Sequence, residues 1–150
     1  MTTRHLLVLA ILALCGLAFV MPSPSPVPQD LKPPSELALL MRNMASFMDT
    51  AKSHTVRGID RPPYPEQFKK MKTATPTEGM VEHAVFDPFA DFYLTTLDSY
   101  YKAKKKDRVQ RYNALVQACA NCHMQVCPGP LVRIKKMYVP LPEPIPTKKK

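Results

Sequence analysis

Proline is absent from two long stretches of a chain that is otherwise rich in it. The 150 residues include 17 prolines, but none lies between Ser35 and Arg61 and none between Phe89 and Cys127. Because proline breaks the interior of a helix, these two gaps are where long helices can form. The sequence also lacks internal repeats and convincing pairs of alternating strands, so we expect an all-α protein rather than a repeat or sheet architecture.

Recognisable catalytic groups are missing as well. No nucleophile with a neighbouring general base and no open catalytic metal set is evident, so we do not expect an enzyme. The basic residues are not interleaved with aromatics, as a single-strand binder would require, which argues against nucleic acid. The formal net charge of +9 instead suits protein partners with acidic surfaces or an anionic membrane surface. Plain solubility is the simpler explanation of the same charge.

Charge is absent from the segment between Leu6 and Val20, which is an uninterrupted apolar run. A short basic start containing Arg4 precedes it, and this combination is typical of a signal peptide. Residues 1–20 are therefore expected to be a signal peptide or an uncleaved N-terminal anchor. Either one predicts a bacterial protein outside the cytoplasm, in the periplasm or otherwise extracytoplasmic.

The most informative feature that is present is a C-x-x-C-H run at Cys119, Cys122 and His123. This spacing is the attachment signature of a c-type heme, because two thiols add across the two vinyl groups of one porphyrin and the adjacent imidazole reaches the iron. On a helix the three residues stand at i, i+3 and i+4, which share one face. We therefore expect one covalently attached heme c, with His123 as the proximal iron ligand. The predicted export agrees with this, since c-type heme is attached outside the cytoplasmic membrane in bacteria.

Other kinds of site use similar residues. The motif together with Cys127 could form a Cys3His zinc set, but these residues lie on one short segment without a second, separate pair of ligands. A non-heme, zinc-binding interaction protein is therefore the lesser alternative. A thioredoxin-like disulfide would need its C-x-x-C directly after a strand. If Cys15 leaves with the signal peptide, a heme consumes two of the three remaining cysteines and leaves Cys127 as a buried thiol or as a link to a second chain in a homodimer.

Proline and capping residues mark the first segments of the chain. Residues 21–34 form a Pro-rich spacer with little apolar surface to bury. Ser35 is a good N-cap, apolar residues then recur with the helical period, and Gly58 is a suitable stop. A first long helix is therefore expected from Ser35 to about Arg57.

Two further helices are expected before the motif. The residues from 64 to 73 fit one short helix within an irregular, Pro-rich connection. Asp87 and Pro88 form a favoured pair of N-cap and first helical residue. The helix that they open is expected to run to the lysines at 102–106, where positive charge suits a helix C-terminus.

A last long helix carries the C-x-x-C-H motif. Asp107 opens this helix, and Pro128 and Gly129 end it. Its inner stripe is expected to consist of Val109, Tyr112, Leu115, Val116, Cys119, Cys122, His123 and Val126. The remaining residues, 128–150, form a Pro/Lys-rich tail that is expected to be extended and mobile from Arg133.

The late position of the motif, the helical content and the domain size resemble the class II cytochromes c, the cytochrome c′ family. The resemblance covers residues 35–127 and implies an antiparallel four-helix bundle with the heme inside one end. In low-spin members a Met of the first helix, followed by a basic residue, is the sixth iron ligand. Met41-Arg42 looks like that pair, so the resemblance assigns Met41 as the distal ligand, with Met44 in reserve. In five-coordinate members an apolar residue covers the iron, and the protein binds gases such as nitric oxide.

The sixth ligand decides between two functions. Met41, Met44 and Met48 share one helix face, where core packing is the simpler explanation. His54 lies thirteen residues past Met41, about 20 Å along a helix, so the two cannot both reach one iron. His54 and His83 are expected to be surface or capping residues. With His and Met ligands the protein is expected to carry single electrons between redox partners, whereas an open sixth position predicts a gas-binding or sensing protein.

Overall fold

The computed structural model describes residues 33–141. The elements follow in the order α2 (Glu36–Arg57), η1 (Glu66–Lys72), α3 (His83–Lys102), η2 (Lys105–Asp107), α4 (Arg108–Gln125) and α5 (Leu131–Lys135), where η denotes a 3₁₀ helix. No strand is present within residues 33–141, and the expected all-α class is confirmed for that range. The predicted signal peptide or anchor at 1–20, nearly all of the spacer at 21–34 and the end of the tail lie outside the described residues.

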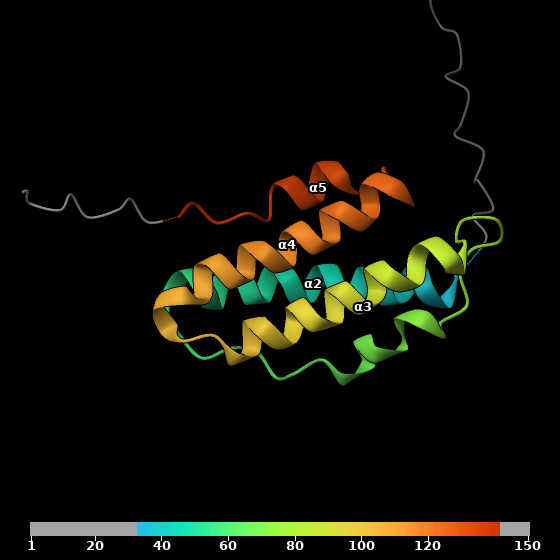
Figure 1. The fold of residues 1–150 in the computed structure, drawn as a ribbon. Coiled ribbons are helices and arrows are strands. Elements are labelled where there is room, and N and C mark those ends of the chain that lie inside the picture. Colours follow the sequence, from blue (N-terminus) through green and yellow to red (C-terminus); the bar gives the residue numbers. More distant parts are fainter. Residues whose placement is uncertain (1–32, 142–150) are drawn as a thin grey trace, which may run out of the picture. The chain divides into compact units, whose positions relative to one another are not determined.

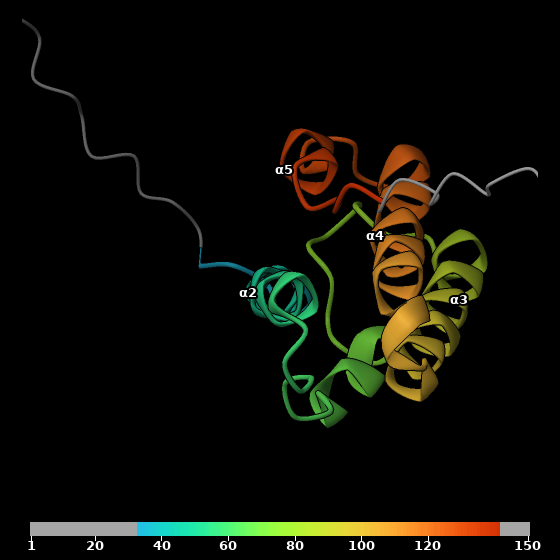
Figure 2. The same cartoon turned by 90° about the vertical axis from the view of Figure 1, so that its left-hand side faces the viewer.

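Three long helices form the body of the domain (Figure 1). α3 and α4 are antiparallel neighbours joined by the short turn at η2, and α2 lies across from them, as the end view shows (Figure 2). The connection at 58–82 runs back along α2, because Arg61 near its start donates to the carbonyl of Ala103 and Thr75 near its end accepts from the N–H of Leu37 at 3.0 Å. η1 lies in this connection and contacts both α2 and α3. In the described range, none of the helices combines the length and apolar character needed to cross a membrane.

Both ends of α2 lie where the sequence predicts them. The side chain of Ser35 accepts a hydrogen bond from the N–H of Ala38 at 3.2 Å, which makes it the N-cap. Gly58 ends the helix with a φ of 66°, in the left-handed region that costs glycine least. Its N–H bonds to the carbonyls of His54 and Thr55, which satisfies the last turn.

The start of α3 differs from the prediction. Asp87 is not the N-cap, because α3 begins at His83 and contains Pro88. The N–H of Phe86 donates to the carbonyl of Glu82 at 2.9 Å, and the Phe86 ring is only 2% exposed. We attribute the extra turn to burial of this ring, which outweighs the one backbone hydrogen bond that Pro88 cannot donate. Asp87 contacts the ring of His83 instead, at 3.1 Å.

The short helix and the last long helix agree better with prediction. The segment at 64–73 contains η1, which is a 3₁₀ helix and buries Phe68 and Met71. α4 begins directly after Asp107, although the side chain of Asp107 makes no capping hydrogen bond. α4 ends at Gln125, three residues before the first proline that follows it.

The first part of the tail packs against the helices, so the prediction of an extended, mobile segment is wrong there. Residues 131–135 form α5, which lies beside α4 (Figure 1). Ile134, Met137 and Val139 are buried. Asn113 of α4 accepts from the N–H of Val139 at 2.9 Å and donates to its carbonyl at 2.7 Å. The tail therefore has apolar surface to bury, which its proline and lysine content conceals.

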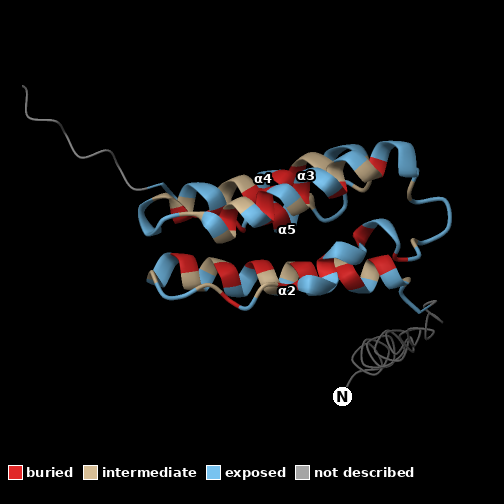
Figure 3. Cartoon of the chain, turned by 60° about the horizontal axis from the view of Figure 1, so that its bottom comes forward, coloured by how far each residue is buried: buried red, intermediate tan, exposed pale blue. Residues whose placement is uncertain are grey.

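Buried residues recur along each long helix, between exposed ones (Figure 3). Near the α3–α4 turn, Tyr100 and Tyr112 are fully buried. The Tyr100 hydroxyl lies 3.1 Å from Thr55 Oγ1, and the Tyr112 hydroxyl donates to the carbonyl of Met48 at 3.2 Å. These bonds join α2 to α3 and α4 across an interior where the Cα atoms of α2 and α3 stay more than 8 Å apart. Tyrosine rings thus fill the space at this end of the domain.

Candidate functional site

The C-x-x-C-H motif lies in α4, toward the end that is far from the α3–α4 turn. Cys119, Cys122 and His123 are each partly buried, and all three line one cavity. This is the arrangement that positions i, i+3 and i+4 predict for a helix, since they share one face. The structure therefore brings the three predicted heme-attachment residues together.

The cavity has a volume of about 370 Å³. This falls within the range of roughly 300–1,000 Å³ that is usual for cofactor and small-molecule sites. α2, α3, α4, the tail and the end of the 58–82 connection form its walls. The lining includes Met41, Met44, Met48, Met71, Met80, Phe86, Phe89, Tyr93, Cys119, Cys122, His123, Ile134 and Met137. A largely apolar space that meets two thiols and an imidazole has the chemistry that a covalently attached tetrapyrrole requires.

The imidazole of His123 is held by the backbone just after α4. Its Nδ1 lies 2.8 Å from the carbonyl oxygen of Cys127. Because a carbonyl can only accept, Nδ1 carries the proton and donates it. Nε2 of the neutral ring then has a free lone pair for a metal, and the ring orientation is fixed. This is the state that a proximal iron ligand needs.

The two other described histidines do not line the cavity. Nδ1 of His54 bonds to the carbonyl of Asp60 beyond the end of α2. Nδ1 of His83 lies 3.1 Å from Asp87 on the first turns of α3. Both rings therefore make their contacts at helix ends, as the sequence predicts, and neither lies where a distal ligand would be needed.

The thiols of the motif are held in their neutral form. Burial raises the pKa of Cys119 to about 12, and the nearby Cys122 adds to this shift. Burial likewise raises the pKa of Cys122 to about 11. Addition of S–H across a vinyl group consumes a thiol, so neutral thiols are compatible with heme attachment.

The Cys3His zinc set is not assembled by the fold. Within the described part of the chain, no three His, Cys, Asp or Glu side chains are grouped so that they could hold a metal ion. The lesser alternative of a zinc-binding interaction protein therefore has no geometric support in these residues. Cys127 is partly buried and contributes its backbone carbonyl to His123.

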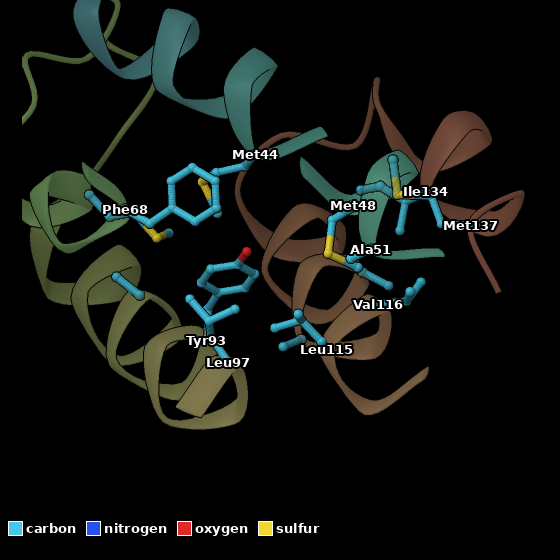
Figure 4. Close-up of a cluster of buried hydrophobic side chains, with 14 of the residues drawn as sticks. Met44, Met48, Ala51, Phe68, Tyr93, Leu97, Leu115, Val116, Ile134 and Met137 are labelled. Atoms are coloured by element: carbon cyan, nitrogen blue, oxygen red, sulfur yellow. The ribbon is translucent and has the colours of Figure 1, made fainter. Parts of the chain in front are cut away.

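Three methionines of α2 face the cavity, on a different helix from the motif. Met48 is 1% exposed and Met44 is 6% exposed, while Met41 is partly buried. Figure 4 shows Met44 and Met48 projecting from α2 into the interior that they share with Phe68 and Tyr93. The structure therefore brings both predicted distal candidates, Met41 and Met44, to the cavity that contains His123.

The tail supplies a wall that sequence reasoning missed. Pro130, Arg133, Ile134 and Met137 line the cavity. Arg133 pairs with Asp49 of α2 at 2.8 Å, and this contact ties the tail to the opposite wall. The sequence held one signal for this, since Leu131 and Ile134 are apolar residues at a helical spacing.

The hydroxyl of Tyr93 is the one buried polar atom of the described residues that lies in the cavity wall without a hydrogen-bond partner. The Tyr93 side chain is 2% exposed. Leaving a buried hydroxyl unpaired costs on the order of 1–3 kcal/mol. An occupant that offers an acceptor would remove this cost, so the unpaired hydroxyl also fits a cavity built to hold another group. The sequence shows only that residue 93 is a tyrosine, so it gives no signal that this hydroxyl is unpaired.

Comparison of the chain with protein-family models, curated proteins and solved structures found no match. The family resemblance therefore rests on the motif, its position and the helical organisation. The interpretation of the site rests on the residues that line the cavity and on their geometry.

Proposed function

We propose that this protein is an exported, c-type monoheme cytochrome that carries single electrons between protein partners. Cys119 and Cys122 would hold the heme through thioether bonds, and His123 would be the proximal iron ligand. The observation that carries the proposal is that these residues share one apolar cavity, in which the Nδ1 hydrogen bond of His123 leaves Nε2 free to coordinate.

On the opposite wall Met41 is the proposed distal ligand, with Met44 in reserve. The support is that both line the cavity across from the helix that carries His123. When bound, the heme would supply a reversible one-electron change between ferrous and ferric iron. The apolar walls would exclude water, and a thioether ligand would favour the ferrous state. His123, held by the Cys127 carbonyl, would keep its orientation in both states.

We propose further that the fold is an irregular antiparallel four-helix bundle of the cytochrome c′ type. In this arrangement α2, η1, α3 and α4 would be the four members, with the 3₁₀ helix η1 in the place of the second helix. The return of the connection along α2 supports this direction of the chain. The tail would be an addition that closes the cavity.

The proposed partners are redox proteins with acidic docking surfaces, because the chain carries a formal net charge of +9. An anionic membrane surface is a second surface that this charge suits. The proposed location is the periplasm, which follows from the apolar N-terminal run and from the site of c-type heme attachment. Cys127 remains the proposed link if two copies pair.

Heme content is the direct test. The full chain is to be expressed in a bacterium that attaches c-type heme. We expect the native protein to be red and to show low-spin ferrous and ferric spectra. After denaturation in acid and organic solvent, we expect the protein to retain its porphyrin. A matched pair of variants sharpens the result: Cys119→Ser with Cys122→Ser should lose covalent heme, whereas Cys127→Ser should keep it. A colourless wild-type protein, or porphyrin extracted intact, would refute the proposal.

A further inference from the structure

The hydroxyl of Tyr93 lines the cavity but has no role in heme attachment. The Tyr93 ring comes from α3 and packs against Phe68 of η1, with ring centroids 6.4 Å apart. Figure 4 shows the hydroxyl directed from α3 toward the side of the interior where Met44 and Met48 of α2 lie. The hydroxyl is buried, lines the cavity and has no partner among the described residues.

The acceptor for this hydroxyl has to come from the occupied cavity. Arg42 and Arg133 also line the cavity, but both are exposed and can only donate, so carboxylates of an occupant would be drawn to them at the rim. Several sulfurs line the cavity: those of Cys119 and Cys122, those of Met71, Met80 and Met137, and those of the α2 methionines. A thioether sulfur is a weak acceptor, and Figure 4 shows the hydroxyl directed toward the side where methionines of α2 lie, which favours these among the sulfurs.

We propose that the hydroxyl of Tyr93 donates a hydrogen bond to the thioether sulfur of the α2 methionine that ligates the iron. Tyr93 is thereby a positioning residue of the distal side. This inference rests on the proposed function, because it needs a methionine-ligated heme. Burial holds the pKa of Tyr93 well above its ordinary value, so the hydroxyl keeps its proton and stays a donor at neutral pH.

Such a hydrogen bond has a measurable consequence. It withdraws electron density from the sulfur, so the thioether donates less to the iron and the ferric state is stabilised less. Removing the donor therefore lowers the reduction potential. It also shifts the sulfur-to-iron charge-transfer band of the ferric protein, because this band reports the electron density on the sulfur.

The test is Tyr93→Phe in the heme-loaded full chain. Phenylalanine keeps the ring and its packing against Phe68, and removes only a hydroxyl that is unpaired within the protein. The matched control is Tyr100→Phe, which removes a buried hydroxyl of the same helix at the other end, where Thr55 is its partner at 3.1 Å. We expect Tyr93→Phe to lower the reduction potential and shift the charge-transfer band, and Tyr100→Phe to change neither.

Two failures can be told apart. If the wild-type protein has no methionine-ligated heme, the proposed low-spin electron carrier and the role of Tyr93 are both wrong. If the wild-type protein has such a heme but Tyr93→Phe keeps the wild-type potential and band, the proposed function stands and only the role of Tyr93 is overturned. Equal shifts in Tyr93→Phe and Tyr100→Phe also overturn it, because they reveal a general effect of losing a buried hydroxyl.

Discussion

The end of the domain at the α3–α4 turn and the end that holds the cavity use the same long helices but fill their interiors differently. At the turn, Tyr100 and Tyr112 pack edge to face with ring centroids 6.1 Å apart, and both hydroxyls are bonded to α2. Arg61 lies over the Tyr100 ring at 5.3 Å and donates to a carbonyl. Arg108 is buried and also donates to a carbonyl, although Nε of each arginine is unpaired.

At the cavity end the helices enclose methionines and neutral thiols around an apolar space, together with the unpaired hydroxyl of Tyr93. Unpaired buried donors therefore occur at both ends, and the difference lies in the volume. At the turn the chain fills the interior with its own side chains, whereas at the end where a cofactor is proposed an apolar cavity remains beside the hydroxyl of Tyr93. Substitutions at the two ends should therefore affect different properties.

The largest expected effect follows from removing the imidazole at the cavity end. His123→Ala leaves both thioether bonds but takes away the proximal ligand, so we expect the variant to lose the low-spin spectrum while the porphyrin stays covalently attached. Optical spectra of both oxidation states measure this. His83→Ala is the matched control, since His83 lies on the first turn of α3 outside the cavity and should leave the spectrum unchanged. A wild-type spectrum in His123→Ala would contradict the assignment.

Removing the proposed distal ligand should have the next largest effect. Met41→Leu keeps an apolar side chain of similar size but no sulfur, so we expect a high-spin ferrous state that takes up carbon monoxide rapidly. Met48→Leu, in the same wall but almost fully buried, is expected to keep the low-spin state. An unchanged spectrum in Met41→Leu would move the assignment to Met44. A wild-type protein that is already high-spin and binds carbon monoxide without displacing a side chain would favour the gas-binding alternative.

Truncating a buried side chain of the tail should have an intermediate effect, and the property that changes is stability. Ile134 is 5% exposed and lines the cavity, so Ile134→Ala should lower the free energy of unfolding by about 2–5 kcal/mol. Val132 lies in the same short helix but is 71% exposed, and Val132→Ala should cost little. Chemical denaturation of the heme-loaded protein measures both. Equal, small losses would show that the tail does not contribute a wall in solution.

The smallest expected effect lies at the turn end. Tyr100→Phe removes the hydrogen bond to Thr55 and should lower the free energy of unfolding by about 0.5–1.5 kcal/mol. The heme spectrum and the reduction potential should stay as in the wild-type protein, because this hydroxyl lies outside the cavity lining. Thermal unfolding and a redox titration check the two halves of this prediction. A changed reduction potential in Tyr100→Phe would mean that a substitution at the turn end also affects the heme site.

Much of the candidate site could be predicted from the sequence. The spacing of Cys119, Cys122 and His123 was sufficient to place them on one helix face, and the periodic methionines placed Met41 and Met44 toward the same interior. The carbonyl that holds His123 could not be predicted, since it depends on how the chain turns after α4. Arg133 and Ile134 were expected in a mobile tail, because local composition does not reveal that a partner surface is present.

What the sequence alone determined is local: the proline-free stretches that contain α2, α4 and all of α3 beyond Pro88, the caps of α2 at Ser35 and Gly58, and the spacing of the motif. These features depend on backbone sterics and on hydrogen bonds between neighbours in the chain. Only the tertiary structure decided the earlier start of α3, the packing of the tail and the isolation of the Tyr93 hydroxyl. Each of these is set by burial against residues far away in the sequence, and burial energies can outweigh local preferences.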